Sequence, residues 1–193
     1  MSVRVEPATA DRWDDLVAAF GKRGADPGWC WCRLFLRRPG TAATQDRPDN
    51  REALRQEMHS AAVPPGLIAY ADGVPVGWTR TGPRSGFPGV TGNRALAKVL
   101  IDDPGTWWVT CFAVGSRHRR TGVGAALLTA AVVFAGDHGA TAVEGHPVDT
   151  AALTAARVSG AAVYTGTMSM FVTAGFVEVA RTYRTRPVMR LEL

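Results

Sequence analysis

Hydrophobic and polar positions alternate along this chain in two different periods. Spacings of three and four residues between apolar side chains predict helices over residues 10–20, 51–62, 122–138 and 164–174. Runs rich in β-branched and aromatic residues predict strands over 67–71, 74–81, 107–114, 141–144, 176–183 and 187–193. Asp72 and Gly73, between the first two strands, are typical of a tight hairpin. The glycine- and proline-rich segment 82–92 is expected to be a loop.

No internal repeat, low-complexity tract or linker interrupts these elements. The pattern therefore predicts a single α+β domain over residues 1–193. Hydrophobic residues make up 46% of the chain and charged residues 20%. These values are ordinary for a globular protein and exclude a disordered or fibrous chain.

Membrane and secretory features are not expected. The longest apolar stretches, such as 125–135, are shorter than the roughly 18–20 residues that a membrane span needs. The first residues lack the apolar stretch of a signal peptide. Three cysteines are too few for a disulfide framework. We therefore expect a cytoplasmic protein without membrane association.

The positive charge of the chain is concentrated in one place. The formal net charge is +5, and residues 104–136 carry three arginines and no acidic residue. These arginines are Arg117, Arg119 and Arg120, with His118 between them. Such a cluster indicates a local anion site, whereas a nucleic-acid binder would carry a broader basic stripe with interleaved aromatic residues.

The basic cluster lies between a predicted strand and a predicted helix that begins with two glycines, Gly122 and Gly124. The first turn of a helix has unpaired N–H groups and a positive dipole end, which together favour an anion. Glycines let a phosphate approach the backbone closely, although tight packing between strand and helix would also explain them. The pattern is neither a Walker A loop nor a dinucleotide-binding Gly-x-Gly-x-x-Gly loop.

The segment Arg119-x-x-Gly122-x-Gly124, after the strand that ends in Phe112, Ala113 and Val114, resembles the acyl-CoA loop of the GNAT acyltransferase superfamily. Two further features fit this family: Phe171 followed by Gly175 and Phe176, and the hairpin 67–81. The resemblance covers residues 67–193 and leaves helices within about 9–62 for the substrate side.

The resemblance implies a GNAT-like fold, with a splayed, mostly antiparallel mixed sheet flanked by helices. It also implies acetyl-CoA as co-substrate, without fixing the length of the acyl chain. The strand edge would pair with the pantetheine arm, and the loop backbone would hold the pyrophosphate. The residues implied in cofactor binding are Phe112, Ala113, Val114, Arg119, Arg120, Thr121, Gly122, Val123, Gly124 and Phe171.

The chain departs from the family pattern at the proton donor. Phe171 stands where many relatives have a tyrosine that protonates the departing CoA thiolate, and Tyr164 stands where an asparagine is usual. Tyr164 is therefore the candidate acid, with structural packing as the alternative. Glu144 and His146, at the end of the strand 141–144, are candidate general bases. The alternative for both is a solvent-exposed turn.

Trp29, Cys30, Trp31 and Cys32 form an unusual run. A metal site needs about four ligands, and no partner cluster accompanies these cysteines, so no metal is expected. The run predicts an aromatic wall between the first two helices. By resemblance, Trp29 and Trp31 would line the acceptor pocket, and core packing is the alternative.

Three functions remain open from the sequence. The first is N-acetylation of a small-molecule amine, and the second is the same reaction on a protein or peptide amine. The third is a CoA-binding sensor without turnover, which Phe171 favours because it lacks a hydroxyl. A homodimer is implied by the resemblance alone.

Overall fold

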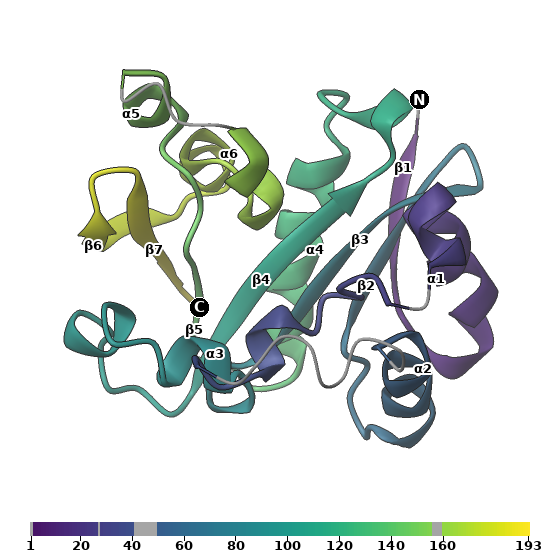
Figure 1. The fold of residues 1–193 in the computed structure, drawn as a ribbon, viewed down its shortest axis with the longest axis horizontal. Helices are drawn as coiled ribbons and strands as arrows, with labels where there is room; N and C mark the ends of the chain where they lie inside the picture. Colours follow the sequence, from purple (N-terminus) through teal and green to yellow (C-terminus); the bar gives the residue numbers. More distant parts are fainter. Residues whose placement is uncertain (1, 27, 41–49, 156–159) are drawn as a thin grey trace.

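The computed structural model describes residues 2–26, 28–40, 50–155 and 160–193. Its centre is one seven-stranded sheet in the order β1-β2-β3-β4-β5-β7-β6 (Figure 1). All neighbouring strands are antiparallel except β4 and β5, which are parallel. The strands are β1 (Val3–Pro7), β2 (Gly66–Ala71), β3 (Val74–Pro83), β4 (Thr106–Val114), β5 (Ala142–Gly145), β6 (Val177–Tyr183) and β7 (Arg186–Glu192).

Helices cover both faces of this sheet. Helix α4 packs on one face, and α1 and α2 lie on the opposite face (Figure 1). The α-helices are α1 (Trp13–Phe20), α2 (Asn50–Ser60), α3 (Pro88–Thr91), α4 (Val123–Asp137), α5 (Thr150–Ala155) and α6 (Met168–Thr173). Short 3₁₀ segments are η1 (Ala10–Arg12), η2 (Gly21–Ala25), η3 (Leu34–Leu36), η5 (Arg84–Gly86), η6 (Leu96–Lys98), η7 (Ser116–His118) and η8 (Gly160–Thr165).

The core is divided by the sheet. Leu127, Phe134 and Phe171 belong to the cluster between the sheet and helices α4 and α6. A second cluster joins α1 and α2 to the other face. The side chains of Trp107 and Trp108 lie in different clusters, on opposite faces, because successive residues of a strand alternate in direction.

The predicted fold class is confirmed, with three local differences. Strand β1 was not predicted, although Val3 and Val5 alternate with polar residues as an edge strand does. The last predicted helix begins at Met168 rather than Tyr164, because Gly166 has a φ of +84° and interrupts it. Within the predicted loop 82–92, residues 88–91 form the short helix α3.

Candidate active site

The sheet splits between its two parallel strands. β4 and β5 pair only from Thr106 with Ala142 to Val109 with Gly145, whereas β4 continues to Val114. A bulge lies at the point of separation, because Cys111 is opposite Arg80 while Val109 is opposite Thr81. Thr110 is thus the extra residue of β4. A bulge bends its strand, so this one turns the second half of β4 away from β5.

Beyond the bulge, β4 has a free edge. Gly115 donates its backbone N–H to the carbonyl of Val76 in β3. Ala113 lies two residues earlier, opposite Trp78, so its backbone groups also point towards β3. Because hydrogen-bonding direction alternates along an antiparallel strand, the backbone groups of Phe112 and Val114 point away from β3. They face the gap that β5 leaves open. An extended molecule can pair with these groups as an added strand does.

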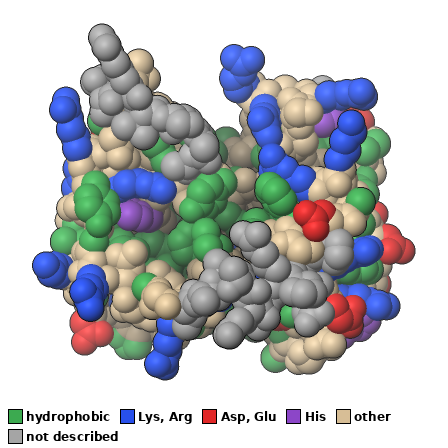
Figure 2. Space-filling view, viewed as in Figure 1, with side chains coloured by type: hydrophobic (Ala, Val, Ile, Leu, Met, Phe, Trp, Pro, Cys, Tyr) green, Lys and Arg blue, Asp and Glu red, His purple; other side chains and the backbone are tan. Residues whose placement is uncertain are grey.

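The split is filled at its inner end by aromatic side chains. Phe171 of α6 is fully buried, with its ring centroid 6.4 Å from that of Phe112. Gly166 lets the chain approach both rings, since a Cβ there would lie 3.1 Å from each. Figure 2 shows hydrophobic side chains gathered at the centre of this face, with Lys and Arg side chains on either side. The floor of the site is therefore apolar.

The basic loop connects the end of β4 to α4. Arg120 has a φ of +62° and Gly122 a φ of +90°, so the backbone turns sharply twice before α4 begins. No side chain caps α4, and its first turn carries no acidic residue. Arg117, Arg119 and Arg120 are exposed and form no ion pair with any described residue. The loop thus leaves helix N–H groups and three cations available to an anion.

Two different structural constraints explain why glycine stands at positions 122 and 124 of the loop. A Cβ on Gly122 would meet no atom within 4 Å, so its left-handed φ is what requires glycine. A Cβ on Gly124 would lie 3.2 Å from the Sδ atom of Met170 in α6. Packing of α4 against α6 therefore explains Gly124, whereas Gly122 leaves open space over the helix N-terminus. That open space fits a phosphate group.

Glu144 is part of a buried ion-pair network. Its side chain is fully buried, and Arg84 Nη1 donates to its Oε2 at 2.6 Å while Arg190 Nη1 donates to its Oε1 at 3.0 Å. Arg190 also binds Asp103 at 2.7 Å. A buried carboxylate whose two oxygens are both bound by guanidinium groups has no free path to a substrate. This placement does not support the expected role of Glu144 as general base.

His146 lies just after β5, beside the β6–β7 hairpin. Its Nε2 is 2.8 Å from Thr182 Oγ1, and its backbone carbonyl accepts a hydrogen bond from Arg186 at 3.1 Å. Burial and the neighbouring Arg186 guanidinium lower the pKa of His146 to about 4. The imidazole is therefore neutral near pH 7, as a general base must be before it accepts a proton, but its pKa lies well below the value near 7 that suits such a base.

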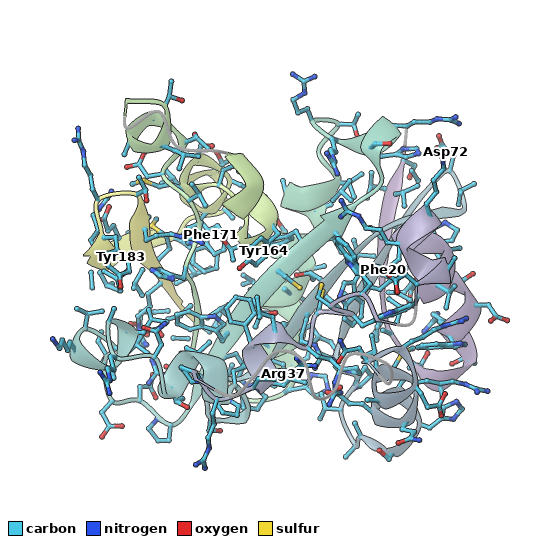
Figure 3. All side chains as sticks on the ribbon, viewed as in Figure 1. Phe20, Arg37, Asp72, Tyr164, Phe171 and Tyr183 are labelled. Carbon is cyan, nitrogen blue, oxygen red and sulfur yellow. The ribbon has the colours of Figure 1, made fainter. Side chains whose placement is uncertain are left out.

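Tyr164 belongs to the segment η8, which contacts β4, and its side chain lies near the split (Figure 3). Its side chain is exposed, and its ring lies 6.4 Å from that of Phe35. Burial of part of the side chain raises the pKa of Tyr164, so its hydroxyl stays protonated near neutral pH. The phenol is thus a candidate proton donor, which the fully buried Phe171 cannot be.

The structure separates the two tryptophans. Trp31 is fully buried and stacks on Trp13 with ring centroids 5.8 Å apart. It is a core residue, with no exposed surface to offer an acceptor. Trp29 is 36% exposed, and the guanidinium of Arg23 lies 4.6 Å from its ring centroid. Only Trp29 can contact an acceptor in this arrangement.

Sequence reasoning missed several residues of the site. We did not predict three features: the bulge at Thr110, the packing role of Gly145, and the hydrogen bond of 2.8 Å from Arg186 Nη1 to Thr165 Oγ1. Each depends on a neighbour far along the chain. The available indication was the arginines of the apolar strands, Arg80 in β3 and Arg186 and Arg190 in β7, since a buried guanidinium needs a partner.

The described residues contain neither a metal-binding cluster nor a membrane span. No group of three or more His, Cys, Asp or Glu side chains among them is arranged to hold a metal ion. In the same part of the chain, no helix has the length and apolar character to cross a membrane.

A mixed sheet that splits between β4 and β5, with a basic, glycine-containing helix N-terminus at the opening, defines an α/β protein with an open strand edge beside a basic loop. The family model described as the acetyltransferase (GNAT) family matches residues 30–158. The chain belongs to this family. No curated protein matches it.

Solved structures of the same fold cover almost the whole chain at low identity. The PaiA N-acetyltransferase from Thermoplasma acidophilum, in complex with coenzyme A, is 12% identical with a TM-score of 0.53, covering 100% of both chains. The diaminobutyrate acetyltransferase from Paenibacillus lautus, with its substrate and coenzyme A, is 15% identical with a TM-score of 0.52, covering 99% and 95%. The ribosomal-protein-alanine N-acetyltransferase from Brucella melitensis is 15% identical with a TM-score of 0.56, covering 98% and 99%.

Proposed function

We propose that this protein is an N-acetyltransferase that transfers an acetyl group from acetyl-CoA to the amine of a small molecule. The observation that carries the proposal is the free edge of β4 at Phe112 and Val114, which leads directly into the basic loop before α4. This arrangement offers a linear path from an apolar floor to an anion site. Coenzyme A has the matching order of thioester, pantetheine arm and phosphates.

The residues present fit this co-substrate. The loop backbone at Thr121, Gly122 and Val123 would hold the pyrophosphate, with Arg119 and Arg120 beside it. Gly122 leaves space for the phosphate because nothing lies within 4 Å of its missing Cβ. The backbone edge from Phe112 through Ala113 to Val114 would pair with the pantetheine amides, with the carbonyl of Val114 giving up its 3.4 Å hydrogen bond from Arg119 Nε. When bound, acetyl-CoA supplies the activated carbonyl carbon that an amine attacks.

The chain's own groups then have separate tasks. The backbone N–H of Phe112 is directed at the open edge of β4 near the ring of Phe171, where it can donate to a carbonyl oxygen that gains negative charge. His146 is neutral near pH 7 and can take a proton from the attacking amine through water. Tyr164 keeps its phenolic proton and can give it to the leaving sulfur. Phe171 excludes water from the inner end of the split.

The acceptor is the least constrained part of the proposal. We place it near Tyr164, which comes from the segment beside β4, and towards Trp29, the exposed tryptophan of the run 29–32. Fold neighbours act on both kinds of amine, since one carries diaminobutyric acid and another is named for ribosomal-protein alanine. A protein or peptide acceptor is therefore the second candidate. A CoA-binding sensor is the third, because Phe171 lacks the hydroxyl that many relatives use.

Calorimetric titration with acetyl-CoA tests the binding part. Arg120→Glu reverses one loop charge and should weaken binding about tenfold or more. Arg120→Gly removes the charge and suits the φ of +62°, so it separates lost charge from backbone strain. Arg94→Glu, an exposed residue outside the loop, is the matched control and should leave binding unchanged. Equal affinity in all four proteins contradicts the proposed cradle.

Release of free thiol from acetyl-CoA in the presence of an amine panel tests the reaction. The panel should contain diamines, amino acids, aminoglycosides and peptides with free N-termini. Thiol release with a small amine, accompanied by its acetylated product in the mass spectrum, supports the proposal. Release with peptides alone selects the second candidate. Tight acetyl-CoA binding with no release across the panel selects the sensor.

A further inference from the structure

The three cysteines of the chain lie outside the groups assigned to acetyl transfer. Cys30 is exposed, whereas Cys32 and Cys111 are buried. Cys32 and Cys111 belong to the same cluster of buried side chains, and Cys30 lies two residues before Cys32 at the surface. The cysteines therefore lie in order from the surface loop towards strand β4.

A tight turn brings the first two thiols together. Arg33 donates its backbone N–H to the carbonyl of Cys30 at 2.8 Å, so Trp31 and Cys32 are the central residues of a four-residue turn. Their φ angles are +43° and +52°. Two successive left-handed residues are typical of a type I′ turn, which normally has asparagine and glycine at these positions. A tryptophan and a cysteine there hold a strained backbone conformation.

The turn is held in place by its tryptophan. Trp31 is fully buried, its ring N–H donates to the carbonyl of Asp26 at 2.9 Å, and it packs on Trp13 and Phe20. Strain that the surroundings maintain is found mainly at functional sites. Here the turn places a buried cysteine, Cys32, two residues after the exposed Cys30.

The surroundings of Cys30 favour its thiolate. Hydrogen bonds from the thiol and backbone N–H of Cys32, together with the charge of Arg23, lower the pKa of Cys30 to about 6. Hydrogen bonding with its two thiol neighbours and its own burial raise the pKa of Cys32. Cys30 also lines an open cavity of about 370 Å³ with Trp29 and Arg37. A small reagent can therefore reach Cys30 but not Cys32.

We propose that this turn is a redox modification site, in which Cys30 is the thiol that reacts with hydroperoxides and Cys32 is the thiol that resolves the product. The Cys30 thiolate attacks one peroxide oxygen, the O–O bond breaks, and the second oxygen leaves as hydroxide or alkoxide, which solvent protonates. Cys30 is then a sulfenic acid. The sulfur of Cys32 attacks the sulfur of Cys30, the S–O bond breaks, and hydroxide leaves with the Cys32 proton as water. Two thiols lose two electrons to one peroxide and form the disulfide.

The site does not depend on acetyl transfer. None of the three thiols has a task in the proposed reaction, so the modification can be tested whether or not an acceptor is known. A metal centre is not the explanation we infer, because no group of three His, Cys, Asp or Glu side chains in the described residues is arranged for one.

Hydrogen peroxide treatment of the reduced protein, followed by thiol titration and peptide mass mapping, tests the proposal. The titre should fall from three thiols to one, with a Cys30–Cys32 disulfide that dithiothreitol reverses. In Cys32→Ser, the sulfenic acid on Cys30 persists and dimedone labels it. In Cys30→Ser, an exposed position where folding is not at risk, neither the disulfide nor the label forms.

Cys111→Ser is the matched control and should behave as the unchanged protein does, because Cys111 is buried in β4 and lies outside the turn. Three outcomes overturn the proposal: a titre that stays at three under excess peroxide, a disulfide that joins Cys32 to Cys111, or dimedone labelling that survives in Cys30→Ser. If Cys32→Ser does not fold, peptide mass mapping of the peroxide-treated unchanged protein and of Cys30→Ser is enough to accept or reject the proposal.

Discussion

The ring of Phe171 occupies the space that a side chain on Gly145 would need, since a Cβ on Gly145 would lie 2.5 Å from the Cε1 atom of Phe171. Gly145 is the last residue of β5 and pairs with Val109 immediately before β4 turns away. The ring of Phe171 therefore lies at the point where β4 and β5 separate. Any side chain on Gly145 has to displace this ring or strand β5.

This contact predicts that Gly145→Ala lowers the free energy of unfolding by about 1–3 kcal/mol, the usual cost of overpacking a rigid core. The ring cannot retreat easily, because Phe176 lies 4.9 Å away on its other side. Urea unfolding of both proteins measures the difference. Gly86→Ala is the control, since nothing lies within 4 Å of its missing Cβ and its φ is not left-handed.

A double-mutant cycle tests whether Phe171 is the cause. Phe171→Leu removes the ring atoms closest to Gly145 and is itself destabilising, because it leaves a cavity. In the Phe171→Leu background, Gly145→Ala should cost about 1 kcal/mol less than it does alone. Strict additivity of the two changes shows that the alanine acts elsewhere.

The buried network predicts a different result for Glu144. Glu144→Gln leaves Arg84 and Arg190 without their shared charge and should cost about 3–5 kcal/mol, the usual result of breaking a buried pair. The rate of acetyl transfer per folded molecule, measured where the variant is still folded, should stay within about twofold. A general base would show the opposite result, with a much larger loss of rate at nearly unchanged stability.

Local chemistry explains which parts of the candidate site could be predicted from the sequence. Arg119, Arg120 and Gly122 lie within one short segment, so the proposed anion loop follows from their spacing and needs no distant partner. Glu144 has its partners 60 and 46 residues away, and nothing in its neighbourhood distinguishes a base from a buried ion pair.

The tryptophans illustrate the same limit. Trp29 and Trp31 are two residues apart, which would place them on one face of a strand. The left-handed turn at Trp31 and Cys32 sends them to different environments instead, and residues other than glycine rarely adopt it. Nothing in the sequence predicted the strained turn, or the arrangement of Cys30 and Cys32 that depends on it.

Gly122→Ala should impair both stability and binding. A Cβ at a φ of +90° is strained although no atom obstructs it, so we expect a loss of about 1 kcal/mol in unfolding free energy. Relaxation of the strain moves the first N–H groups of α4, so acetyl-CoA binding should weaken as well. Gly122→Asn should be milder in both respects, because asparagine tolerates left-handed backbone better. Thermal unfolding and calorimetry measure the two effects.

The His146 environment predicts a dependence of stability on pH. Its pKa falls from an ordinary 6.5 to about 4, so below pH 6.5 the unfolded state binds a proton that the folded state does not. Its contribution is present in full above pH 6.5 and is lost as the pH falls from 6.5 to about 4. Allowing for residual solvent contact, we expect a loss on the order of 1–2 kcal/mol.

The melting temperature of the protein and of His146→Gln, measured between pH 7.5 and pH 4, checks this expectation. Glutamine keeps a hydrogen-bonding group near Thr182 but does not titrate, so the variant should lose less stability over this range. Parallel curves for the two proteins assign the acid sensitivity to other groups.

The choice between Tyr164 and Phe171 predicts how the proton reaches the leaving thiolate. If Tyr164 donates it, Tyr164→Phe should lower kcat about tenfold to a hundredfold with little change in KM for acetyl-CoA, because only the hydroxyl is lost. Phe171→Tyr should not restore the rate in that background, since the far end of its ring lies 2.6 Å from the Cβ position of Gly145 and points into the strand. The loss in Tyr164→Phe should be smaller with a thioester of a more acidic thiol than with acetyl-CoA, because such a thiol departs without a proton donor. A variant that keeps the full rate with both thioesters makes Tyr164 a packing residue against Phe35.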